Sequence, residues 1–168
     1  MAVSKKKLFE IFLSPENAGL KTVGLFLGII FNPGSLFLLI DALWRGRFST
    51  ALFHEFPYWI NLFFLMILFI NVLIGIYFAN AFGESIKHEG TGMAIWNGVA
   101  GGTAIGFITG ATIGIFPGIA DFHFHDLSDT ILPAITYSII GLLIGAFIGL
   151  IIALLTALLW HLMSGVAP

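Results

Sequence analysis

The sequence predicts an all-α membrane protein, a small bundle of bilayer-crossing helices that forms a single membrane domain over residues 1–168. Two observations support this class. Hydrophobic residues make up 58% of the chain and charged residues only 10%, whereas soluble domains carry about 25% charged residues. In addition, the stretches 56–83, 90–120 and 130–168 contain no Asp, Glu, Lys or Arg. Each is longer than the roughly 20 residues that a spanning helix needs.

The first element that we expect is a short amphipathic helix over residues 1–14. Lys5, Lys6 and Lys7 precede a short stretch from Leu8 to Leu13 that is apolar except for Glu10. A basic and apolar segment of this kind can lie on the lipid headgroups. The apolar run is too short for the core of a cleaved signal peptide, so we expect none.

The first membrane span is expected at about 18–44, and it is interrupted by the tripeptide Asn32-Pro33-Gly34. Asparagine is a good helix N-cap and proline favours the first helical position, so a new helix begins there. One interpretation is a kinked span, which gives four spans in total. The alternative is three spans preceded by a re-entrant or interfacial helical hairpin. Both place the N-terminus in the cytoplasm by the positive-inside rule, and we expect an inner (cytoplasmic) membrane of the bacterial type.

The remaining spans are expected at about 57–82, 94–117 and 131–160, and the last two carry glycines at intervals of four residues. Residues four apart share a helix face, and a face of glycines lets another backbone approach closely. We therefore predict that these two spans form a tight antiparallel hairpin. In the alternative, one glycine face meets another copy, another subunit, or a flat ligand such as a pigment. The helix-packing residues are Gly98, Gly102, Gly106, Gly110, Gly114, Gly141, Gly145 and Gly149.

Two polar residues lie inside apolar stretches, where ionisable and amide groups are costly and often functional. Asp41 precedes Arg45 by four residues, a spacing suited to an ion pair on one helix. Asn71 is the deepest asparagine of the expected second span. We expect it to form a hydrogen bond between helices, and a role in an ion path is the alternative.

The loop between the third and fourth spans holds the residues that most resemble a metal site: Asp121, His123, His125 and Asp126. Alternating histidines in an extended segment point the same way, and with carboxylates they can bind zinc or copper. The alternative is a solvated turn whose last residues, Ser128 or Asp129, cap the next helix. Four spans put this loop outside the cell, and three put it in the cytoplasm.

The function that the sequence favours is structural. No catalytic triad, phosphate-binding loop or mid-span lysine is present, so we expect no enzymatic activity. The net charge of −2 gives no basic surface for nucleic acid. We predict an accessory subunit of a larger membrane complex, with the bilayer, other membrane subunits or its own copies as partners. No cofactor is identified, although lipid or pigment contact is compatible with the glycine faces. The alternatives are a homo-oligomeric channel or transporter and a metal-handling protein that uses residues 121–129.

Overall fold

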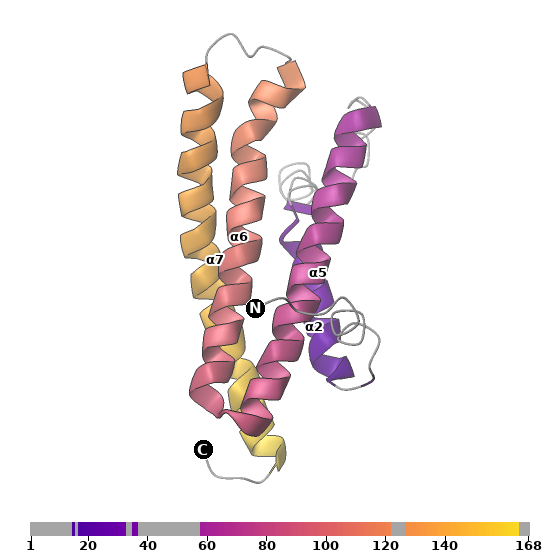
Figure 1. The fold of residues 1–168 in the computed structure, drawn as a ribbon, viewed down its shortest axis with the longest axis vertical. Coiled ribbons are helices and arrows are strands. Elements are labelled where there is room, and N and C mark those ends of the chain that lie inside the picture. The colour runs from indigo at the N-terminus through magenta and orange to yellow at the C-terminus, as the bar shows by residue number, and fades with distance from the viewer. Residues whose placement is uncertain (1–14, 16, 33–34, 37–57, 122–126, 165–168) are drawn as a thin grey trace, which may run out of the picture.

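The computed structural model describes residues 15, 17–32, 35–36, 58–121 and 127–164. The helices whose bounds it gives are α2 (Ala18–Ile30), α5 (Tyr58–His88), α6 (Thr91–Asp121) and α7 (Leu127–Ser164), and no strand occurs in this part of the chain (Figure 1). Three helical segments, Ile60–His88, Thr91–Ile115 and Ile131–Leu162, are long and apolar enough to cross a membrane. The prediction of an all-helical membrane protein is confirmed at this level.

Helices α6 and α7 include the expected spans 94–117 and 131–160 and extend beyond both ends of each, while α5 begins at Tyr58, one residue inside the expected span 57–82, and extends beyond its end. The helices are longer than expected for a simple reason. The length of a charge-free stretch indicates how much of the chain contacts hydrocarbon, whereas the helix itself continues into the headgroup region. The expected first span begins with α2, whose 13 residues cover about 20 Å, less than the roughly 30 Å of hydrocarbon. Residues 37–57 and the expected surface helix 1–14 lie outside the described residues.

The turn between α5 and α6 is tight because Gly90 permits it. The amides of Glu89 and Gly90 both donate to the Ser85 carbonyl at 2.8 Å, and Gly90 has a φ of 99°. Glycine adopts this left-handed conformation without steric cost, and it commonly ends helices in this way. Thr91 then begins α6 at once, so α5 and α6 run antiparallel.

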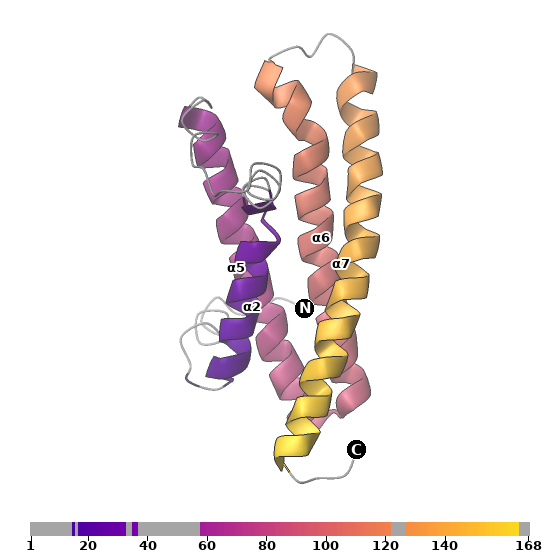
Figure 2. The same cartoon turned by 180° about the vertical axis from the view of Figure 1, so that it is seen from behind.

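The helices form two antiparallel pairs that are joined on one side. Helix α6 packs along α7, α2 packs along α5, and contacts between α5 and α6 connect the pairs (Figures 1 and 2). Helix α2 begins beside the end of α5, because Asn17 is hydrogen-bonded to Glu84. It ends beside the middle of α5, where Asn71 contacts the carbonyl of Phe31.

The distribution of side chains is that of a protein solvated by lipid. The buried polar residues include Asn71, Thr109, Thr112 and Ser138. In contrast, Phe147 is 64% exposed, and many other large apolar residues of α5 and α7 are also exposed. An apolar surface of this extent is unstable in water but is the expected surface in a bilayer.

Candidate functional site

Within the described residues, an apolar cleft lies between the pair α2–α5 and the pair α6–α7. Its volume is about 370 Å³, within the range of sites that hold small molecules. Thr109, Thr156 and Tyr137 are the only residues with polar side-chain atoms among those that line it. The rest of the wall is aliphatic, aromatic or glycine, and it includes Leu20, Leu27 and Phe31 of α2, Phe78 and Phe82 of α5, Ile105 and Ile113 of α6, and Ile144, Ile148 and Ile152 of α7.

One wall of this cleft is the seam between α6 and α7, and all eight glycines named above lie in it. A Cβ atom added at any of them would lie within 3.0 Å of the opposite helix. The obstruction is backbone at seven of the eight positions, and at Gly98 it is the Cβ atom of Ala153, 2.5 Å away. Backbone atoms cannot rotate away as side chains can. The present separation of α6 and α7 therefore depends on the absence of side chains at these positions.

The contacts across the seam are reciprocal. A Cβ on Gly102 would meet the carbonyl oxygen of Gly145, and a Cβ on Gly145 would meet the carbonyl oxygen of Gly102. Gly106 and Gly141 form an equivalent pair. Since the Cβ position is that of a glycine hydrogen, these hydrogens point at carbonyl oxygens. This is the geometry of Cα–H···O contacts, which are weak singly but repeat along the seam.

The seam glycines have a second neighbour besides the opposite helix. All of them except Gly114 also line the cleft. A strip of backbone without side chains therefore faces the interior of the cleft, where another molecule can approach it closely.

A second close approach joins α2 to α5. A Cβ on Gly24 would collide with the backbone of Gly75, and the reverse is also true. A Cβ on Gly28 would lie 2.6 Å from the Cα of Val72. This contact brings the last turn of α2 against the middle of α5, and it places the end of α2 next to Asn71.

The end of α2 is held by a polar cluster between α5 and α6. Asn71 is completely buried; its Nδ2 donates to Thr109 Oγ1 at 3.1 Å and to the Phe31 carbonyl oxygen at 3.5 Å. Thr109 Oγ1 in turn donates to the same carbonyl at 2.5 Å. The side chain expected to bond between helices thus contacts both α6 and the carbonyl of Phe31, the C-cap residue of α2.

Two buried acceptors, one in this cluster and one on the residue that follows Phe31, have no partner among the described residues. They are the Oδ1 atoms of Asn32 and Asn71, and both are buried. A buried acceptor without a hydrogen bond costs about 1–3 kcal/mol. Each of these two oxygens can therefore accept a further donor or ligand.

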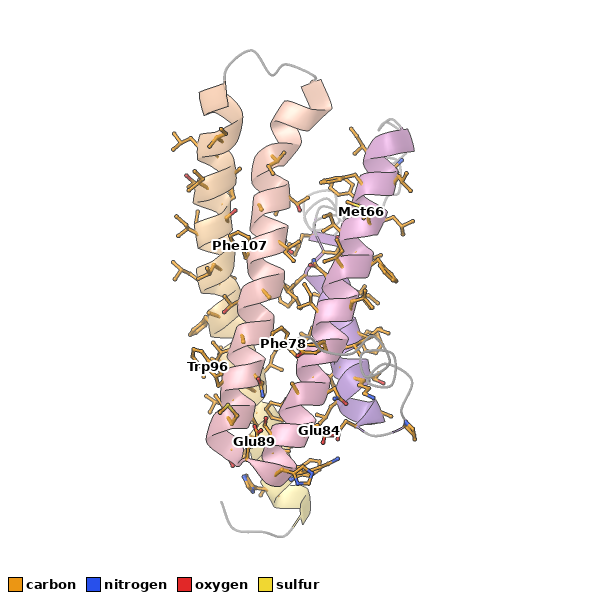
Figure 3. All side chains as sticks on the ribbon, viewed as in Figure 1. Met66, Phe78, Glu84, Glu89, Trp96 and Phe107 are labelled. Carbon is orange, nitrogen blue, oxygen red and sulfur yellow. The ribbon has the colours of Figure 1, made fainter. Side chains whose placement is uncertain are left out.

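Most of the other polar contacts between helices gather at the end of the bundle that carries the α5–α6 turn. Asn17 donates to Glu84 at 2.6 Å, and Figure 3 shows Glu84 and Glu89 near this end. Asn97 donates to Ser85 Oγ at 2.8 Å. Thr91 and His161 are 3.0 Å apart and tie the start of α6 to the end of α7.

Several residues singled out in the sequence cannot be located. Asp41, His123, His125 and Asp126 lie outside the described residues, and Asp121 is seen only as the last residue of α6. Within the part of the chain that is described, no group of three or more His, Cys, Asp or Glu residues could hold a metal ion. Metal binding by the loop stays a prediction.

Sequence reasoning missed three features of the bundle. The cleft depends on how two helix pairs lie together, for which the sequence carries no local signal. Thr109 resembled the other threonines of its helix, and only its partner distinguishes it. Lys21 is buried, with 7% of its surface exposed. The apolar residues around it in the sequence were a signal from which this burial could have been predicted.

Comparisons with known proteins add no family to this description. No protein-family model, curated protein or solved structure matches the chain.

Proposed function

We propose that the chain is a small structural subunit of a larger membrane assembly, in which the cleft between the helix pairs receives part of a neighbouring subunit or a bound lipid or pigment. The cleft carries this proposal. The two pairs are joined through α5 and α6, while residues of both α2 and α7 line the cleft. A bundle built in this way buries its inner faces fully only when something fills the space between the pairs.

The glycine seam fits the same role. Lipid provides no hydrophobic driving force between helices, and a row of glycines allows one helix to pack closely against another without it. In our proposal the seam first holds α6 and α7 together, and its cleft-facing strip then accepts a second flat or helical surface.

The proposed orientation follows from the position of the basic residues. Lys21 of α2 and Lys87 of α5 belong to segments that meet at the same end of the bundle, because Asn17 contacts Glu84 there. Basic residues favour the cytoplasm. We therefore propose that the α5–α6 turn and the start of α2 face the cytoplasm, with α5 beginning on the other side.

The test is purification from the native membrane in a gentle detergent, followed by blue-native electrophoresis and mass spectrometry of the band. Ile144 and Leu143 provide a matched pair of variants, since they are adjacent, both are exposed, and only Ile144 lines the cleft. We expect Ile144→Trp to reduce comigration with the assembly and Leu143→Trp to leave it unchanged. A chain that migrates as a free monomer would contradict the proposal.

The second candidate function is a homo-oligomeric channel or transporter. The ending of α2 near the middle of α5 favours it, since transporters place their sites at broken helices. Against it, the hydroxyls of Thr103 and Thr112 donate to carbonyls of their own helix, and Asn97 donates to Ser85. Ion or solute flux in proteoliposomes, measured with the purified chain, distinguishes this function from a structural one.

A further inference from the structure

The end of α2 is a concentration of neutral oxygen atoms inside the membrane-spanning bundle. At 1.5 Å per residue, Asn71 lies roughly 20 Å along α5 from Tyr58 and roughly 26 Å from His88. The C-terminal end of α2 meets α5 at this depth, through Phe31 and Asn71. A helix C-terminus carries the negative end of the helix dipole, so α2 directs negative potential at the middle of the bundle.

The hydrogen-bond pattern of the described residues around the end of α2 leaves two buried acceptors without a donor. Both hydrogens of Asn71 Nδ2 are directed at oxygens, those of Thr109 and Phe31. The hydroxyl of Thr109 donates its hydrogen bond to the Phe31 carbonyl. The Oδ1 atoms of Asn71 and Asn32 find no partner in the described part of the chain, although the two residues are only 0% and 4% exposed.

The chemistry of these atoms selects the class of ligand. Amide, carbonyl and hydroxyl oxygens are hard ligands that suit alkali and alkaline-earth cations rather than zinc or copper. A divalent ion at this depth would need carboxylates to balance its charge, and the described residues hold no group of acidic side chains at this place. Lys21 lies about 15 Å from Phe31 along α2, so its positive charge does not compete with a cation bound there.

We propose that the C-terminal end of α2, together with Asn32, Asn71 and Thr109, forms a binding site for a monovalent alkali-metal cation. The cation accepts electron density from the two free amide oxygens and from the helix end. It thereby fixes the end of α2 between α5 and α6. Phe31 and Thr109 also line the cleft, but the cation site does not depend on the function proposed for the cleft.

The experiment is thermal unfolding of the purified full chain in detergent, followed by tryptophan fluorescence. NaCl, KCl and choline chloride are compared at equal ionic strength. We expect the melting temperature to rise with Na⁺ or K⁺ but not with choline. A cation at 100 times its dissociation constant multiplies the folding equilibrium constant about 100-fold. Equal melting temperatures in the three salts would overturn the proposal and leave the two oxygens to buried water.

Two variants locate the effect. Asn71→Leu removes one of the free oxygens, and we expect it to abolish the difference between the alkali salts and choline. Asn97→Leu is the matched control, because it also removes an asparagine that bonds between α5 and α6 but lies nearer the α5–α6 turn. It should lower the melting temperature and retain the cation response. An unchanged response in Asn71→Leu would overturn the assignment. If that variant does not fold, Asn32→Ala tests the second oxygen in the same assay.

Discussion

The substitution Gly106→Ala tests whether the backbones of α6 and α7 are in direct contact. The added Cβ would collide with the carbonyl of Gly141 and lie 3.0 Å from the Cα of Gly145. Neither atom belongs to a side chain that can turn away. The collision is relieved only if the two helices move apart or slide along each other, and we expect the variant to be less stable.

The size of the effect follows from two opposing contributions. Forcing a methyl group into a closely packed interface costs about 1–3 kcal/mol. A change from glycine to alanine inside a helix returns about 0.5–1 kcal/mol, because alanine loses less backbone entropy on folding. The expected net loss is therefore about 0–2.5 kcal/mol. The double variant Gly102→Ala/Gly106→Ala should lose less than the sum of the single variants, since one separation of the helices relieves both collisions.

The assay is equilibrium unfolding of the purified protein in mixed micelles, with helix content as the signal. Gly92→Ala serves as the control, because a Cβ at that position of α6 would meet nothing within 4 Å. It should be neutral or stabilise the protein by up to about 1 kcal/mol. If Gly106→Ala were as stable as Gly92→Ala, the reasoning from backbone contact would be refuted.

Two further predictions test the polar contacts and the topology. Thr109→Val should lower the free energy of unfolding by about 1–3 kcal/mol, because it leaves the Phe31 carbonyl without its closest donor. Thr112→Val is the control, since it loses only a bond to its own helix, and it should change the free energy of unfolding by less than about 0.5 kcal/mol. Equal losses for the two variants in the same unfolding assay would contradict the prediction. The sequence contains no cysteine, so His88→Cys and Leu162→Cys can each be labelled with a membrane-impermeant maleimide in sealed vesicles. We expect both to react from the same side, since Thr91 and His161 join the two ends, and labelling from opposite sides would contradict the arrangement of α6 and α7.

The sequence predicted the long helices well because the bilayer itself sets their length. A charge-free stretch of more than 20 residues has few alternatives to a helix in lipid, where every backbone polar group must be satisfied within the segment. Thus α5, α6 and α7 correspond to the three clearest expected spans. The ends were less predictable. Helix α5 continues through Glu84 and Lys87 to His88, because helix formation does not stop where contact with hydrocarbon does.

The candidate site divides in the same way between local and non-local features. A period of four glycines defines one face of a helix without reference to any other segment, so the seam residues could be named from the sequence. The cleft could not, since it depends on which faces of two helix pairs remain apart. For the same reason Asn71 could be expected to bond between helices, while its partners, Thr109 and the Phe31 carbonyl, could not be chosen among similar groups.

The two close approaches in the bundle differ in what holds them, and this difference bears on function. The seam of α6 and α7 runs over more than four helical turns, from Gly98 to Gly114, and at every glycine except Gly98 it consists of backbone packing. Helix α2 is shorter, and it is held by the approach of Gly24 and Gly28 to α5, by apolar contacts such as that of Leu20 beside Gly83, and by polar bonds at Asn17 and Phe31. Loss of either polar contact therefore removes a larger share of the contacts that hold α2 than one substitution removes from the α6–α7 seam. Helix α2, which contributes to the wall of the cleft, is therefore the helix whose position a ligand, a cation or a partner subunit can change most easily.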